Sequence, residues 1–214
     1  MLTVGIVGLG QIGGSLAAAL TRRKLARVVG VARRERTAKR ARRMGIVAEA
    51  TLDPLAVSAL DVIVLATPVR TLLGQIPGIA PKIRPGAILT DVGSTKKDIL
   101  DAFRRARPRA TVVAGHPMAG NERAGLDGTD PELFVGRPWV LIPIRPSDRR
   151  AAAPLERLVR GVGAIPRWMR DPADHDLKVA RVSHIPYLLS YALMGTPEDA
   201  IRVCGNSFRD ATRV

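Results

Sequence analysis

A glycine pattern near the amino terminus constrains the fold of this chain more than any other feature of its sequence. Gly8, Gly10 and Gly13 lie in GLGQIG, between the β-branched run LTVGIV and the segment GSLAAALTRRK, which reads as a helix ending in basic residues. Here the first glycine permits a tight turn, the second lets a pyrophosphate approach the backbone, and the third lets helix and strand pack closely. The pattern predicts a dinucleotide-binding turn in which Gln11 and Ile12 also contact the cofactor.

Short apolar runs continue to alternate with helix-like segments as far as about residue 165. After the first strand, strands are predicted over residues 26–34, 59–67, 86–91, 110–114 and 139–143. Continuous apolar strands that alternate with helices are typical of a parallel sheet covered on both faces. The sequence therefore predicts a doubly wound α/β domain of Rossmann type over residues 1–165.

A different pattern follows. From Asp174 onward the chain reads as helix, with apolar residues on one side at helical spacing. These residues are Val179, Val182, Ile185, Leu188, Leu189 and Ala192. We predict that residues 166–214 begin an all-α domain, and we expect the natural polypeptide to continue, because no closing helix or cap precedes Val214.

Composition excludes several classes of protein. With 46% hydrophobic and 25% charged residues, the chain is neither wholly disordered nor fibrous. A single cysteine, Cys204, and the lack of a Cys/His cluster at ligand spacing argue against a disulfide scaffold or a metal site. No apolar run reaches the roughly 18–20 residues of a membrane span, and glycines interrupt the uncharged amino-terminal stretch. We therefore expect a cytoplasmic protein with no membrane partner.

The positive charge is concentrated in one segment. The chain carries a net charge of +15, and residues 22–43, with eleven basic residues and one acidic residue, hold +10 of it. A basic run first suggests nucleic acid, but an aromatic content of 3% leaves little for base stacking. The run also coincides with the end of the second predicted strand, so we expect one small polyanion, and no nucleic acid, as the partner.

The end of that strand indicates which dinucleotide binds. An NAD site usually has an Asp or Glu there to accept the ribose hydroxyls, whereas this chain reads VARRERT over residues 31–37. Arg33 can stack on adenine and, with Arg34 and Thr37, hold a 2′-phosphate, so we predict NADP. Glu35 would favour NAD instead if it faced the ribose. The predicted cofactor-binding set also includes Thr67 and Pro68, at the end of the third strand.

Two loops that follow predicted strands supply candidate catalytic residues. His116 lies in GHPMAG, just after a buried strand, and the following proline restricts its orientation. Ser94 lies in DVGSTK, where it either caps the next helix or turns its hydroxyl toward the site. Open α/β folds bind ligands at this edge of the sheet, so both residues are candidates.

Together these segments resemble the prephenate/arogenate dehydrogenase family over essentially the whole chain. The likeness rests on GLGQIG, DVGSTK, GHPMAGNERAG, LFVGRPWVL, DPADHD, SHIPY and SFRDATRV. Residues 32–37 look like the NADP-dependent, arogenate-preferring branch. The resemblance implies oxidative decarboxylation of L-arogenate to L-tyrosine, with hydride transfer to NADP, in a homodimer formed through the helical domain.

The resemblance also implies roles for single residues. His116 matches the histidine that takes the proton of the substrate's ring 4-hydroxyl, and Ser94 matches the serine that supports the same hydroxyl. Arg213 matches the arginine that grips the ring carboxylate. Asp176, after His175, would orient groups around the site.

The SHIPY segment bears on the choice of substrate. His184 matches a histidine that serves either the helix or the substrate. Tyr187 stands where prephenate-specific members often have a histidine, and this departure favours arogenate. Prephenate dehydrogenase with NAD or NADP, giving 4-hydroxyphenylpyruvate, is the nearest alternative. A β-hydroxyacid dehydrogenase, an imine reductase and a non-catalytic NADP- or nucleic-acid-binding protein are more remote.

Overall fold

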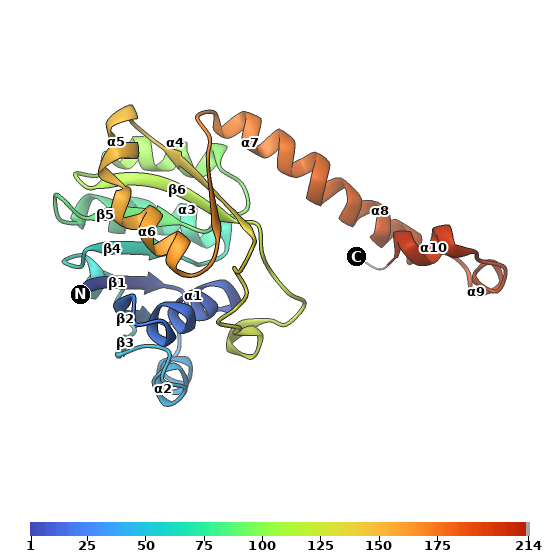
Figure 1. Ribbon diagram of the computed structural model, residues 1–214, viewed down its shortest axis with the longest axis horizontal. Coiled ribbons are helices and arrows are strands. Elements are labelled where there is room, and N and C mark those ends of the chain that lie inside the picture. Colours follow the sequence, from blue (N-terminus) through green and yellow to red (C-terminus); the bar gives the residue numbers. More distant parts are fainter. Residues whose placement is uncertain (213–214) are drawn as a thin grey trace. The chain divides into compact units, whose positions relative to one another are not determined.

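Eight strands form one sheet, in the order β3-β2-β1-β4-β5-β6-β7-β8, in the computed structural model, which describes residues 1–212 (Figure 1). The strands are β1 (Leu2–Val7), β2 (Ala26–Val31), β3 (Glu49–Thr51), β4 (Val62–Leu65), β5 (Ile88–Asp91), β6 (Thr111–Pro117), β7 (Pro138–Pro143) and β8 (Ile165–Trp168). All neighbouring strands are parallel except β6 and β7. The order reverses at β1, whose neighbours are β2 and β4. This is the topological switch point where open α/β sheets bind ligands.

Helices cover both faces of this sheet. They are α1 (Gln11–Arg22), α2 (Glu35–Arg43), α3 (Val69–Ile79), α4 (Lys97–Ala106), α5 (Pro146–Ala151) and α6 (Ala153–Gly161), with 3₁₀ turns at Pro54–Val57 and Ala80–Lys82. Val62 and Val64 of β4 pack in one hydrophobic cluster with α1, α2 and α6, whereas Ile63 and Leu65 pack with α3 and α4. Alternate side chains of a strand point to opposite faces, so the two helix groups lie on opposite sides. The predicted doubly wound α/β fold is confirmed.

The sheet departs from the predicted wholly parallel arrangement at β7. Trp139 pairs with Pro117, and Pro143 pairs with Val113, so β7 runs antiparallel to β6. The connection over residues 118–137, all of which is described, carries one 3₁₀ turn, η3 (Gly125–Gly128), and no crossover helix. A parallel neighbour requires a crossover that returns the chain to the opposite edge of the sheet. Without one, β7 starts beside the point where β6 ends.

The chain divides into two units, Met1–Pro172 and Ala173–Val214. The sequence pattern changes near residue 165, but β8 pairs with β7 and therefore extends the sheet of the first unit. Helices α7 (Pro172–Val179), α8 (Ile185–Leu193), α9 (Glu198–Ile201) and α10 (Asn206–Ala211) follow, with a π-helical turn at Ala180–His184. This confirms the helical character predicted for the region, as far as residue 212. No helix in the described part of the chain is long and apolar enough to cross a membrane.

A carboxylate joins the amino ends of β1 and β4. Asp61 Oδ2 accepts hydrogen bonds from the backbone N–H and the hydroxyl of Thr3, each at 2.8 Å, and Asp61 Oδ1 accepts one from Arg84 Nη2 at 2.7 Å. The Thr3 backbone N–H and hydroxyl, followed by the Arg84 guanidinium, lower the pKa of Asp61. Because the folded-state pKa is depressed, the stabilisation is present above the unfolded pKa and is lost as the pH falls through the folded value.

Replacing Asp61 by Asn is expected to lower the free energy of unfolding at neutral pH by about 1 kcal/mol, since the side chain is 36% exposed and solvent screens its bonds. Urea unfolding at pH 7 and at a series of pH values falling below the ordinary aspartate pKa of about 3.9 measures the difference. It should shrink progressively as the pH falls, because the wild-type carboxylate becomes protonated. Asp101→Asn is the matched control: Asp101 is 39% exposed and pairs with Arg104 at 2.8 Å. An equal loss in both variants would contradict the role given to Thr3.

Candidate functional site

The glycine turn lies between β1 and α1, at the carboxyl edge of the sheet. Gly8 has φ +106°, and a Cβ there would lie 2.7 Å from the carbonyl oxygen of Ala66. A Cβ at Gly13 would lie 2.0 Å from the Gly8 carbonyl oxygen. Side chains are therefore excluded at both positions, by the turn at Gly8 and by the close packing of α1 at Gly13.

Gly10 differs from the other two glycines. It is the N-cap of α1, its backbone is extended, and a Cβ there would meet no heavy atom within 4 Å. The open space thus lies directly at the start of a helix, where free N–H groups and the helix dipole attract anions. The turn fits the pyrophosphate of a dinucleotide, with Gly8 and Gly13 shaping it and Gly10 leaving room.

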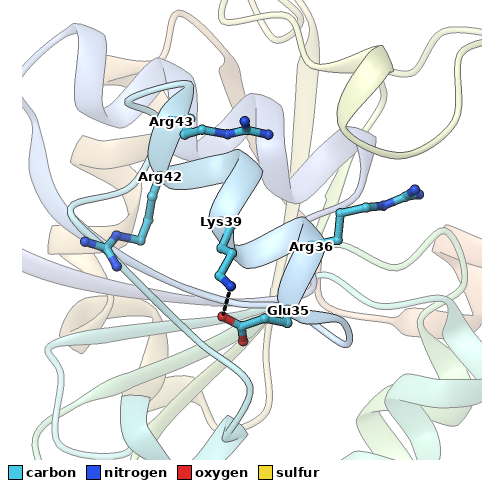
Figure 2. Close-up of a pocket in the computed structure, with 5 residues that line it drawn as sticks. All are labelled: Glu35, Arg36, Lys39, Arg42 and Arg43. Atoms are coloured by element: carbon cyan, nitrogen blue, oxygen red, sulfur yellow. Dashed lines mark ion pairs between the residues drawn. The ribbon is translucent and has the colours of Figure 1, made fainter.

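The residues predicted to determine cofactor specificity follow β2, which neighbours β1 in the sheet. Arg33 and Arg34 are exposed, Arg34 is the N-cap of α2, and the Arg34 carbonyl oxygen accepts the Thr37 N–H at 2.9 Å. Glu35 begins α2, and its carboxylate pairs with Lys39 Nζ at 3.6 Å across one helical turn (Figure 2). The hollow in Figure 2 is lined by Glu35, Arg36, Lys39, Arg42 and Arg43, so it lies farther along α2 than Arg33 and Arg34.

The predicted base lies on a strand of the same sheet. His116 is the penultimate residue of β6, is paired in register with Val140, and is only 8% exposed. Ser94 is exposed in the connection between β5 and α4. Helix α4 begins at Lys97 with Lys96 as its N-cap, so the Ser94 hydroxyl does not cap it. This leaves that hydroxyl available to the site.

An ion pair that the sequence analysis did not identify lies beside these residues. Asp91, the last residue of β5, and Lys96 are both fully buried, and Lys96 Nζ donates to Asp91 Oδ2 and, at 2.6 Å, to the Gly115 carbonyl oxygen. Asp91 accepts the Gly93 N–H at 2.7 Å and the Gly115 N–H at 3.1 Å. A strand-final Asp followed five residues later by Lys was the only sequence sign of this pair.

The loop after β6 is attached to the glycine turn through Gln11. Its amide nitrogen donates to the carbonyl oxygens of Asn121 and Arg123, at 2.7 and 2.8 Å, and to the Asn121 side chain. Ser15 Oγ accepts the Asp130 N–H at 3.0 Å. Gln11 was predicted as a cofactor ligand, but in this structure its amide nitrogen holds the loop that follows His116.

The same loop is also tied to α2. Arg40 pairs with Asp127 of η3, and this ion pair, followed by the charges of Arg123 and Arg36, lowers the pKa of Asp127. The start of α1, the basic helix α2 and the loop after His116 are therefore joined by polar contacts at one edge. Thr67, also predicted to bind the cofactor, lies at this edge after β4, where its hydroxyl donates to Gln75 at 2.7 Å, and Pro68 is the N-cap of α3.

The remaining predicted residues belong to the second unit. His175 Nδ1 and Asp176 Oδ1 are 2.7 Å apart. His184 ends the π-helical turn, and Tyr187 lies one helical turn later in α8; both are exposed and line a small hollow in this unit. Arg213 lies outside the described residues. Within residues 1–212 no group of three His, Cys, Asp or Glu side chains is placed to hold a metal ion.

Comparison with known proteins gives matches along the whole chain. Residues 16–166 match the family model of the prephenate dehydrogenase nucleotide-binding domain, and residues 171–214 match that of the prephenate dehydrogenase dimerization domain. The chain is 29% identical to prephenate dehydrogenase of Bacillus subtilis, with 99% of this chain aligned. It spans only 60% of that relative's length.

Two solved structures are similar throughout. Arogenate dehydrogenase of Synechocystis aligns with a TM-score of 0.83 and 32% identity over 99% of this chain and 78% of its own. Prephenate dehydrogenase of A. aeolicus, in complex with hydroxyphenyl propionate and NAD⁺, aligns with a TM-score of 0.81 and 30% identity over 100% of this chain and 77% of its own.

Gly10→Ala is expected to weaken dinucleotide binding by about tenfold or more, because the new methyl group fills the space that the pyrophosphate needs. Titration with NADPH and with NADH, followed by nucleotide fluorescence, measures the dissociation constants. The midpoint of thermal unfolding should stay near the wild-type value, because a Cβ at Gly10 meets no neighbour.

Gly74→Ala is the matched control for this variant. Gly74 lies within α3, and a Cβ there also meets no heavy atom within 4 Å. This substitution should leave both dissociation constants unchanged. Unaltered dissociation constants in Gly10→Ala would contradict the assignment of the β1–α1 turn as the dinucleotide-binding site.

Proposed function

The chain belongs to the prephenate dehydrogenase family, and from this premise we propose that it is an oxidoreductase of tyrosine biosynthesis that converts L-arogenate to L-tyrosine with NADP. One observation carries the proposal. A dinucleotide cradle at the β1–α1 turn and a nearly buried histidine near the end of β6 lie at the same edge of one sheet. A redox cofactor and a base near its reactive end are the two requirements of this reaction.

The chemistry explains why a histidine is needed. The proposed substrate carries a hydroxyl on C4 of a cyclohexadiene ring and a carboxylate on the opposite, quaternary carbon. Hydride leaves C4, the hydroxyl proton passes to a base, and the ring carboxylate departs as CO2. The phenolate that this leaves takes the proton back to give an aromatic phenol. NADP, when bound, supplies the hydride acceptor. Neutral His116 takes the proton, and Ser94 donates a hydrogen bond that orients the hydroxyl.

The choice of NADP is supported by the residues after β2. Arg33 and Arg34 offer charge-assisted hydrogen bonds to a 2′-phosphate, and no acid occupies the final position of β2 to accept ribose hydroxyls. The carboxylate of Glu35 is engaged with Lys39, which supports the same choice. The NAD⁺ in the A. aeolicus complex keeps NAD as the alternative.

Arogenate is proposed as the substrate because of Tyr187 and because of the likeness to the Synechocystis arogenate dehydrogenase. Asp176, His184 and Arg213 are proposed to bind or orient it, as the family resemblance implies. Prephenate dehydrogenase is the second candidate, favoured by the Bacillus subtilis and A. aeolicus relatives.

A homodimer through residues 171–214 is part of the proposal, since these residues match the dimerization-domain model. Leu188, Leu189 and Tyr191 of α8 are more than half exposed. A second copy of the helical domain would cover such apolar side chains.

Turnover of arogenate and prephenate, each measured with NADP and with NAD, tests the proposed preferences for substrate and for cofactor together. The highest kcat/KM is expected for arogenate with NADP, and each mismatch should lower kcat/KM by about tenfold or more, the value of one lost charge-assisted contact. A preference for prephenate would support the second candidate. A preference for NAD would contradict the role of Arg33 and Arg34.

His116→Asn is expected to lower kcat by a factor of about 10² to 10⁴, because the proton of the ring hydroxyl loses its acceptor. The dissociation constant for NADP should stay within about twofold of wild type, since His116 is not part of the glycine turn. Steady-state kinetics and nucleotide fluorescence measure the two effects. Near-normal turnover would rule out His116 as the base.

A further inference from the structure

We propose that Asp91 and Lys96 are positioning residues, whose buried ion pair fixes the strand segment that carries His116 and the loop that carries Ser94. The inference deepens the proposed function and rests on it for the roles of His116 and Ser94. Neither charged side chain is proposed to touch the substrate. Their role is to fix the position of the backbone that carries the His116 and Ser94 side chains.

The pair stands where backbone pairing between β5 and β6 ends. In the described sheet these strands pair only at Ile88 with Thr111 and at Leu89 with Val112, although β6 continues to Pro117. Beyond that point, side chains from the β5 side take both backbone groups of Gly115. Its N–H donates to Asp91 Oδ1 at 3.1 Å, and its carbonyl oxygen accepts from Lys96 Nζ at 2.6 Å.

The approach of the two strands at this point is unusually close. A Cβ on Gly115 would lie 2.5 Å from the Asp91 carbonyl oxygen and 3.0 Å from Trp139 Nε1, so only glycine fits. Gly115 is thus bound from the β5 side through its own N–H and carbonyl groups. The next residue is His116, so a shift of Gly115 moves the proposed base directly.

The same carboxylate also binds the loop that carries the other catalytic candidate, Ser94. Asp91 Oδ2 accepts the Gly93 N–H at 2.7 Å as well as the bond from Lys96. Ser94 lies between these two anchored residues in the sequence. One ion pair therefore links the loop of Ser94 to the strand of His116, through side chains that are fully buried.

Burial indicates what such a pair contributes. Removing two charges from water is unfavourable, and a neutral pair of similar volume is often equally stable or more so. Directional bonds from a fixed ammonium and a fixed carboxylate, by contrast, define positions, and small displacements of reacting groups strongly slow a reaction. The pair is therefore suited to positioning.

The test is the double variant Asp91→Asn/Lys96→Met, which removes both charges and leaves neither one buried alone. Its thermal unfolding midpoint should lie within a few degrees of wild type. With arogenate and NADP, kcat should fall by about tenfold to a hundredfold, because the reacting groups are displaced. Both KM values and the dissociation constant for NADP should change by less than about twofold.

A second measurement does not depend on turnover. Amide hydrogen exchange at Gly115 should accelerate by about tenfold in the double variant, because the hydrogen bonds between Gly115 and the side chains at positions 91 and 96 are weakened or lost. Exchange at Thr111, whose N–H donates to the Ala87 carbonyl oxygen next to β5 at 2.9 Å, should not change. The single variants should be less stable than the double variant, since each leaves one buried charge without its partner.

Arg27→Gln/Glu49→Gln is the control. It removes an exposed ion pair between β2 and β3 and should leave kcat and Gly115 exchange unchanged. Wild-type kcat, or wild-type exchange at Gly115, in the Asp91/Lys96 double variant would overturn the positioning role. Failure of the unaltered chain to turn over arogenate or prephenate would instead contradict the proposed function, while Gly115 exchange would still test the pair.

Discussion

Parallel pairing of β1 with strands on both of its sides is the constraint on which the site depends. Because β2 and β4 flank β1, the connections that leave their carboxyl ends lead in opposite directions along the sheet. Space at that edge is therefore left free beside the end of β1. The glycine turn begins at this point, and Gly8 can follow β1 directly because it adopts a positive φ close to the backbone of Ala66.

Different forces hold the sheet and the edge that carries the site. Apolar packing on both faces fixes β1, β4 and β5, whose side chains are almost all buried. The connections at the carboxyl edge are instead held by polar contacts: Gln11 with the loop after β6, Arg40 with Asp127, and Asp91 with Lys96. Exposed contacts such as the first two are weak, and segments that rely on them open more readily than the core. The Asp91–Lys96 pair is the buried exception. It binds Gly115, the residue that precedes the proposed base His116.

The elements with strong local patterns could be predicted from the sequence, and those set by distant pairing could not. The unbroken apolar run of β4 and the glycines after β1 identify the fold because burial on two faces and a tight turn each demand particular residue types. The direction of β7 depends on how the chain returns after residue 117, which no local pattern of WVLIP encodes. The partners of Asp91 and Gln11 likewise come from segments that the sheet brings close. Lys96 looks like an ordinary surface lysine in sequence, and its complete burial follows only from the approach of β5 to β6.

Ion pairs interrupt the concentrated positive charge of residues 22–43. Five of the eleven basic residues in 22–43 pair with carboxylates in the described structure: Arg22, Arg23, Arg27, Lys39 and Arg40. Such pairing divides the segment, whereas a long polyanion binds best to a continuous row of free cations. Arg33 and Arg34 have no carboxylate within 4 Å among residues 1–212, and they stand at the end of β2, beside the strand that leads into the glycine turn. This arrangement is the basis for proposing a phosphorylated dinucleotide, and not a nucleic acid, as the partner.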